Sequence, residues 1–290
     1  MFKGSFTALI TPFKDEKIDE ESFRSFIDFQ IESGIHGVVP VGTTGESPTL
    51  SHEEHKKAVE ICINQVNKRV PVIAGTGSNN TEEAIDLTCH AEKVGADAAL
   101  IVTPYYNKPT QNGMYKHYEA IANNSNIPII IYNIPGRSIV NMTNETMKEL
   151  FKLKNVLGVK DATADIPRVY SSRIDIGKDF NLLTGDDATC LAFMLYGGHG
   201  TISVTSNIAP KLCSDFMSLC LEGKFKEACK INDILMPLHT ALFIESSPGP
   251  VKYAANKLGL CSSEVRLPLT EISDETKKIV DQALKHASLI

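Results

Sequence analysis

The sequence has no long hydrophobic run and no block of like charge. No segment approaches the ~18 to 20 apolar residues needed to cross a bilayer, and the apolar stretch Phe6–Ile10 is too short for the hydrophobic core of a signal peptide. The 29 basic and 35 acidic residues give a net charge of −6, whereas nucleic-acid binding depends on clustered Lys and Arg. We therefore expect a cytoplasmic chain with no nucleic-acid partner and no membrane partner.

The seven cysteines are odd in number and contain no Cys-x-x-Cys pair. Neither a zinc site nor a disulfide framework is indicated, so we expect reduced thiols. The apolar content of 42% and the charged content of 22% over 290 residues are those of an ordinary globular chain. Disordered, collagen-like and coiled-coil proteins are poor matches to this composition.

Short runs rich in Val and Ile alternate with amphipathic segments over the first two hundred residues, and Asp19, Ser51 with Glu54, and Gly95 mark helix ends. Parallel strands need a crossover that a helix supplies, so eight such repeats predict an α/β fold, the (β/α)8 TIM barrel. The alternative is an open doubly wound sheet, which would carry a Gly-rich phosphate turn where this chain has Thr11-Pro12-Phe13-Lys14. The expected strands are Phe6–Thr11, Gly37–Val41, Val70–Ala74, Ala98–Thr103, Pro128–Tyr132, Val156–Lys160, Phe180–Thr184 and Gly200–Val204.

The β pattern stops at about Pro210, and the remainder of the chain has helical periodicity. We expect a barrel catalytic region over residues 1–209. Residues 210–290 would be a helical region that completes the barrel and forms a C-terminal extension. The expected helices are Lys211–Leu221, Lys224–Leu242, Pro250–Leu258 and Asp274–His286.

Lys160 ends one of the expected strands, where barrel enzymes place their chemistry. Strand alternation puts Lys160 on the same face as Val156 and Gly158. Inside a barrel the ammonium would be desolvated, which lowers the pKa of a lysine and makes the neutral, nucleophilic amine accessible. The pattern favours Schiff-base chemistry. The ordinary alternative for a strand-end lysine is a pair with Asp161 or a side chain that reaches solvent.

Other strand ends carry polar groups. The segment Gly42–Glu46 offers two hydroxyls between two glycines, which suits a nest for a carboxylate but also an ordinary turn. Tyr132 could exchange protons near Lys160 or be a hydrogen-bonded core residue, and Tyr105-Tyr106 is similar. His52-Glu53-Glu54-His55 lacks the spacing of a zinc protease, and we expect it to form a solvated helix face.

Four blocks of the sequence resemble the class I pyruvate aldolase superfamily that includes N-acetylneuraminate lyase, and the resemblance covers essentially the whole chain. Within this superfamily the chain is most similar to the dihydrodipicolinate synthase family. Arg137, the double Thr, the Tyr-Tyr pair, Leu183–Asp187 and Gly197–Ser203 favour that family, whereas Asp161 stands where many relatives have Glu. The four blocks are Gly42-Thr43-Thr44-Gly45-Glu46, Thr103-Pro104-Tyr105-Tyr106, Tyr132-Asn133-Ile134-Pro135-Gly136-Arg137 and Val159-Lys160-Asp161-Ala162-Thr163.

The resemblance implies a lyase in the diaminopimelate route to lysine. Lys160 would form an imine with pyruvate, and the derived enamine would attack the aldehyde of L-aspartate 4-semialdehyde, without a metal or organic cofactor. The implied catalytic residues are Lys160, Tyr132, Thr43 and Tyr106, the last three as a proton relay. The implied substrate-binding residues are Thr44, Arg137, Gly185 and Ile202.

The resemblance also implies assembly and regulation. In relatives, Tyr106 reaches the neighbouring subunit's site, so we expect a homotetramer built as a dimer of tight dimers. L-lysine is expected as a feedback effector, although the same residues also fit an ordinary capped helix with solvated side chains. The matching effector residues are Ser47, Pro48, His52, His55, Asn79, Glu83 and Tyr105.

Two other functions remain open at this point. A sister aldolase would cleave N-acetylneuraminate or a 2-keto-3-deoxy sugar acid with the same lysine. A non-catalytic sensor would bind small keto acids or lysine on an inherited barrel. Arg137 with Tyr106 favours the synthase over the sister aldolases, because a polyol substrate would require groups that recognise hydroxyls.

Overall fold

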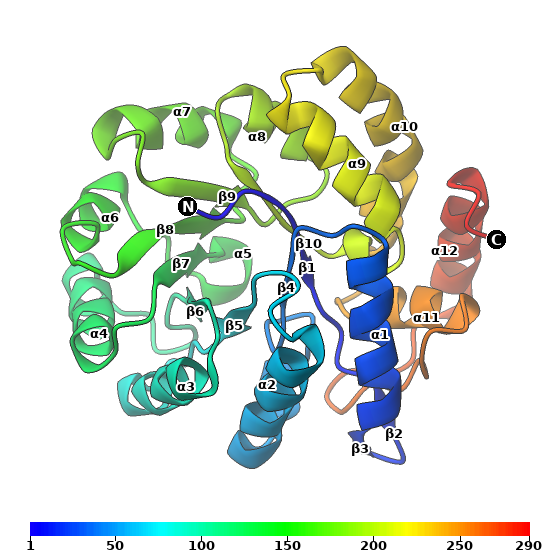
Figure 1. Ribbon diagram of the computed structural model, residues 1–290, viewed down its shortest axis with the longest axis horizontal. Helices are drawn as coiled ribbons and strands as arrows, with labels where there is room; N and C mark the ends of the chain where they lie inside the picture. Colours follow the sequence, from blue (N-terminus) through cyan, green and yellow to red (C-terminus); the bar gives the residue numbers. More distant parts are fainter. The chain divides into compact units, whose positions relative to one another are not determined.

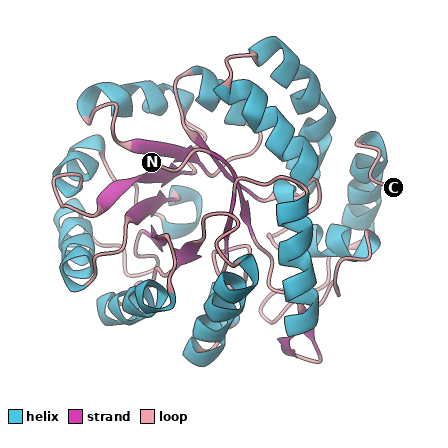
Figure 2. Ribbon diagram, viewed as in Figure 1, coloured by secondary structure: helices cyan, strands magenta, loops and turns pink.

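The computed structural model describes residues 1–290, which divide into two compact units. Unit 1 comprises Met1–Lys3 with Ile73–Ile202, and unit 2 comprises Gly4–Val72 with Ser203–Ile290. Along the chain, parallel strands alternate with helices and the last strand is followed by helices only. Figure 2 colours the strands magenta and the helices cyan. This order is that of a (β/α)8 barrel with a C-terminal helical extension, the predicted fold class. None of the helices combines the length and the apolar character needed to span a membrane.

Unit 1 is built on a parallel sheet with the strand order β10-β9-β8-β7-β6-β5. Its strands are buried because Ile, Val, Leu and Ala dominate them. Helices α3, α4 and α6 lie along the outer side of these strands (Figure 1). The strands are β5 (Ile73–Gly75), β6 (Ala98–Val102), β7 (Ile129–Asn133), β8 (Val156–Asp161), β9 (Asn181–Thr184) and β10 (Gly200–Ser203). The helices are α3 (Thr81–Val94), α4 (Gln111–Asn124), α5 (Pro135–Ser138), α6 (Asn144–Leu150), α7 (Ile166–Asp175) and α8 (Cys190–Leu195).

Unit 2 pairs two parallel strands, β1 and β4, and adds a short antiparallel hairpin, β2 with β3. The buried Asn207 joins the N-terminal strand to the C-terminal part of the unit. Its amide donates to the carbonyl of Ala8 at 2.8 Å and accepts from the N–H of Ile10 at 3.0 Å. The elements are β1 (Gly4–Ala8), β2 (Phe13–Lys14), β3 (Lys17–Ile18), α1 (Glu20–Glu32), β4 (Gly37–Val39), η1 (Ser47–Thr49), α2 (His52–Val66), η2 (Thr205–Asn207), α9 (Pro210–Leu221), α10 (Phe225–Ala241), α11 (Gly249–Lys257) and α12 (Asp274–His286).

The predicted strands and C-terminal helices are all present with small shifts of their ends. The largest shifts are at the start of β5, which begins at Ile73 rather than Val70, and at the end of β1, which ends at Ala8 rather than Thr11. The predicted caps are confirmed: Asp19 accepts from the N–H of Ser22, Ser51 and Glu54 form a capping box, and Gly95 is left-handed.

The β2–β3 hairpin was not predicted from the sequence. Its turn residues Asp15 and Glu16 have φ of +52° and +62°, as a two-residue hairpin turn requires. Such turns are usually recognised in a sequence from an Asn-Gly or Asp-Gly pair. This segment contains no glycine, so the usual signal for a hairpin is missing.

Candidate active site

Lys160 and Tyr132 lie beside each other at the ends of adjacent strands in unit 1. They are paired in the register of β7 and β8, and each is only 6% exposed. The Nζ atom of Lys160 lies 4.0 Å from the centroid of the Tyr132 ring, a distance at which the ring face attracts a cation. Val156 and Gly158 are also buried, as alternation along β8 requires. The strand therefore holds a buried amine against a buried phenol ring.

Gly185, which follows β9, leaves the space that the Lys160 side chain occupies. A Cβ atom at this position would lie 2.7 Å from Cε of Lys160 and 2.9 Å from Cβ of Ala162. Both separations are far below the optimum of ~3.5 to 4.0 Å for two carbon atoms. Ile202 on β10 is 1% exposed. Unit 1 thus brings together three of the predicted residues, Lys160, Tyr132 and Gly185.

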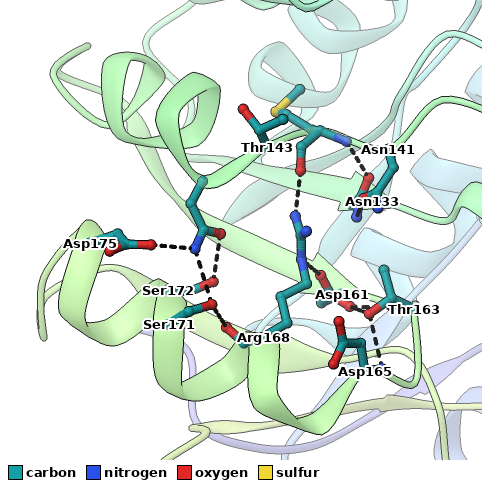
Figure 3. A network of polar contacts seen from close by, with 12 residues as sticks. Asn133, Asn141, Thr143, Asp161, Thr163, Asp165, Arg168, Ser171, Ser172 and Asp175 are labelled. Atoms are coloured by element: carbon teal, nitrogen blue, oxygen red, sulfur yellow. Dashed lines mark hydrogen bonds and ion pairs between the residues drawn. The ribbon is translucent and has the colours of Figure 1, made fainter.

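Asp161 does not neutralise Lys160, although the two are neighbours in the sequence. Its carboxylate accepts from Nε of Arg168 at 2.8 Å and from the N–H and hydroxyl of Thr163 at 2.9 and 2.5 Å (Figure 3). The reason is the alternation of β8, which turns successive side chains to opposite faces. The alternative in which Asp161 pairs with Lys160 is therefore wrong.

The loop that carries Arg137 is attached to the strand ends by the same polar network. Arg168 also donates to the carbonyl of Met142. Asn133, the last residue of β7, donates to Oδ1 of Asn141 at 2.9 Å and accepts from the N–H of Met142 at 3.0 Å (Figure 3). Arg137 itself lies in the short helix α5 and is exposed. A fixed loop with a free guanidinium at its surface can meet an anionic ligand without rearranging.

Tyr106 is 93% exposed, by far the most exposed aromatic residue of the chain. Its backbone is left-handed, with φ of +69°, a conformation uncommon outside glycine. The neighbouring residues are tied down: Asn79 donates to the carbonyl of Tyr105 at 3.1 Å, and Asn107 donates to the carbonyl of Asn79 at 2.9 Å. Packing within one chain does not account for an aromatic ring held outward in this way.

The predicted carboxylate nest is a tight turn in unit 2. Thr44 is buried and Thr43 is half-buried. The turn lies between two left-handed residues, Val41 with φ of +49° and Glu46 with φ of +55°. This conformation is strained for a β-branched residue, and such strain is concentrated at functional sites. Gly45 fits this turn because a Cβ there would make tight contacts of 3.0 Å with both Cα and N of Val41.

The predicted lysine-site residues fall in both units, and four belong to unit 2. Ser47 and Pro48 form the start of the short helix η1. Of the two histidines on α2, His52 is exposed and His55 is only 4% exposed. Glu54 between them forms an ion pair with Arg266 at 2.6 Å. The expectation of a fully solvated helix face is therefore wrong, because part of this turn packs inward.

The other three residues of that set belong to unit 1. Asn79 and Tyr105 are joined by the amide contact to the Tyr105 carbonyl. The hydroxyl of Ser78 donates to Oε2 of Glu83 at 2.7 Å, which holds the carboxylate at the start of α3. Asn79, Glu83 and Tyr105 thus share one loop region of unit 1.

Two charged clusters were missed by the sequence reasoning. One is the contact of Asp161 with Arg168, and the other is a buried ion pair of Glu46 with Lys252 at 2.5 Å. A signal for the second existed, since Lys252 interrupts an otherwise apolar and small run on α11. No group of three or more His, Cys, Asp or Glu side chains is arranged to hold a metal ion.

Comparison with known proteins identifies the family. Residues 1–287 match the model of the Dihydrodipicolinate synthetase family. A 4-hydroxy-tetrahydrodipicolinate synthase of Afipia carboxidovorans is 59% identical over 289 residues, which cover 100% of this chain and 98% of that protein.

Solved structures agree over the same length. The dihydrodipicolinate synthase of Acinetobacter baumannii complexed with pyruvate is 44% identical, with a TM-score of 0.98 and 100% of both chains covered. The enzyme of Cyanidioschyzon merolae with lysine bound is 37% identical, with a TM-score of 0.96, and covers 100% of this chain and 99% of that one. These likenesses confirm the predicted resemblance and fold, and the chain belongs to the Dihydrodipicolinate synthetase family.

Proposed function

We propose that this protein is a Schiff-base-forming lyase that catalyses the 4-hydroxy-tetrahydrodipicolinate synthase reaction, the condensation of pyruvate with L-aspartate 4-semialdehyde. The observation that carries the proposal is the buried Lys160 amine held 4.0 Å from the Tyr132 ring. Relatives that cover the whole chain carry the name of this activity, and one solved relative holds pyruvate. The product belongs to the diaminopimelate route to lysine.

The reaction begins with the amine of Lys160 and the ketone of pyruvate, which form an imine with loss of water. Loss of a methyl proton gives an enamine, which attacks the aldehyde carbon of the second substrate. The amine of that substrate then adds to the imine carbon, and the C–N bond to Lys160 breaks. The enzyme is regenerated, and no oxidant or reductant is consumed.

We assign the proton transfers to hydroxyl groups and the binding to groups around them. Tyr132, Thr43 and Tyr106 form the relay, since each hydroxyl can both donate and accept. Thr44 binds the carboxylate of pyruvate, and the planar cation of Arg137 binds that of the second substrate. The remaining two predicted residues shape the space for the bound pyruvate. These are Gly185 and Ile202.

Trapping with borohydride tests the proposal. Incubation with pyruvate and borohydride should add one reduced pyruvate to the protein, mapped by peptide mass to Lys160. Lys160→Ala should bind no adduct and lose turnover while it keeps its far-UV circular dichroism. An adduct on another lysine, or the absence of any adduct, would refute the mechanism.

A second experiment tests the substrate. Turnover of pyruvate with aspartate semialdehyde is compared with cleavage of N-acetylneuraminate, and robust cleavage of N-acetylneuraminate would overturn the substrate assignment. Arg137→Ala should weaken use of aspartate semialdehyde.

We also propose that the enzyme is a cytoplasmic homotetramer, with residues 1–209 as the catalytic region and 210–290 as the helical region. Four large apolar side chains are exposed on α7, at the end of α8 or directly after it, and these two helices contact each other in unit 1. Exposed apolar side chains on neighbouring helices fit a subunit interface. Sedimentation velocity should give four times the mass of 31.7 kDa. The four exposed side chains are Tyr170, Ile174, Leu195 and Tyr196.

L-lysine is proposed as a feedback inhibitor that binds the predicted seven-residue set. A solved relative holds lysine, and Glu83 offers a carboxylate to an amino group. Tyr105 precedes the relay residue Tyr106, so an effector that moves the first can change the position of the second. Inhibition of initial rates by millimolar L-lysine is the direct test, and insensitivity of the enzyme would refute the site.

A further inference from the structure

Lys252, on the C-terminal helix α11, has a side chain with no exposed surface. Its ammonium donates to Oε1 of Glu46 at 2.5 Å and to the carbonyl of Glu264 at 2.6 Å. The same nitrogen lies 4.0 Å from the centroid of the Phe13 ring, within the range of a cation–π contact. Each contact comes from a different segment of unit 2, so this one cation joins three parts of the chain.

Glu46 is the acceptor of that cation and the last residue of the Thr43-Thr44 turn. It is 2% exposed, and its second oxygen accepts from the N–H of Arg266 at 3.0 Å. The guanidinium of Arg266 binds Glu54 at 2.6 and 2.8 Å, and this hydrogen-bonded pair lowers the pKa of Glu54 to about 2. Two cations of the C-terminal segment thus hold the turn and the helix that follows it.

Stability alone does not explain such an ion pair. Removing two charges from water is unfavourable, and buried ion pairs can often be replaced by apolar residues with no loss of stability. Burial lowers the pKa of Lys252, and the neighbouring Glu46 opposes this effect. An ion pair of defined geometry that adds little net stability is suited to a second role, which is to hold a chain segment in one position. Here that segment is the turn that ends at Glu46.

The Thr43-Thr44 turn requires contacts that hold its backbone in place. The turn begins and ends in left-handed, non-glycine residues, Val41 and Glu46, and an unanchored chain would relax from this conformation. A further anchor is the hydroxyl of the buried Thr11, which donates to the carbonyl of Gly45 at 2.7 Å. The side chain of Glu46 is therefore the point at which the C-terminal extension reaches the turn.

We propose that Lys252 is a positioning residue for the reaction. Its ion pair with Glu46 holds the Thr43-Thr44 turn in the conformation that binds the carboxylate of pyruvate. This inference rests on the proposed function, and it gives the C-terminal extension a role in substrate binding as well as in packing.

The first test is Lys252→Met, which keeps an unbranched side chain only one atom shorter and removes the charge. Adduct formation at Lys160 is measured as a function of pyruvate concentration, a readout that requires no second substrate. The half-saturating pyruvate concentration should rise on the order of 10- to 100-fold, as expected when a binding group is displaced by about 1 Å, while the KM for aspartate semialdehyde stays within about twofold. Lys257→Met is the matched control, because Lys257 on the same helix pairs with Asp281 at 3.3 Å instead of the turn.

The second test separates positioning from stability. In the double variant Glu46→Gln with Lys252→Met no buried charge is left unpaired, so the melting temperature should return toward that of the wild type. The half-saturating pyruvate concentration should stay raised, because the turn has lost its ionic anchor. Return of both quantities to wild-type values, or wild-type pyruvate saturation in folded Lys252→Met, would overturn the inference. Failure of the wild type itself to form the adduct would instead refute the proposed function.

Discussion

Gly185→Ala tests the geometry around Lys160 directly. The added Cβ would lie 2.7 Å from Cε of the lysine, and relief of this overlap requires a shift of about 1 Å, because carbon atoms pack best at ~3.5 to 4.0 Å. A misplacement of about 1 Å in a reacting group can lower the rate on the order of 10²-fold, equivalent to ~2.7 kcal/mol in the barrier. Overpacking of the core by one methyl group should also lower the free energy of unfolding by ~1 to 3 kcal/mol.

The assay for this variant is the rate of borohydride-trapped pyruvate adduct, followed by intact mass, with urea unfolding to measure stability. Gly113→Ala is the control, because Gly113 lies on α4 and its added Cβ would meet only the Pro109 Cβ at 3.1 Å among close contacts. Adduct formation in the control should equal that of the wild type. Formation of the adduct at the wild-type rate in Gly185→Ala would refute the placement of the lysine beside this glycine.

Three further outcomes are expected. Tyr132→Phe and Tyr106→Phe should each lower kcat on the order of 10²- to 10⁴-fold by removing a proton-transfer group, and steady-state turnover near that of the wild type in both would show that the hydroxyls are structural. Glu83→Ala should abolish inhibition by L-lysine in initial-rate measurements, whereas inhibition that survives this change would place the effector elsewhere. Burial lowers the pKa of His117 to about 4, below its ordinary value near 6.5, so the unfolded chain binds a proton that the folded chain excludes. The free energy of unfolding should therefore fall as the pH falls from about 6.5 toward 4, and His117→Asn should reduce that slope in urea titrations at a series of pH values.

Local sequence patterns were sufficient for the strand that carries Lys160. The apolar residues Val156, Leu157 and Val159 indicate the strand, and its two-residue period decides that Lys160 and Asp161 face opposite ways. The two-residue period of the strand does not predict which basic residue forms the ion pair with Asp161. Arg168 follows seven residues later, on a helix, and that contact depends on how α7 packs against the end of β8.

The sequence by itself determined the order of strands and helices, the helix caps, and the residues at the strand ends, because all of these depend on neighbours along the chain. It also carried the family resemblance through its short blocks. Only the tertiary structure decided that His55 is buried while His52 is exposed, and that Lys252 meets Glu46. The last two are 206 positions apart. No local pattern encodes such a pair, because an ionic contact is selected by the packing that brings the two charges together and excludes water from both.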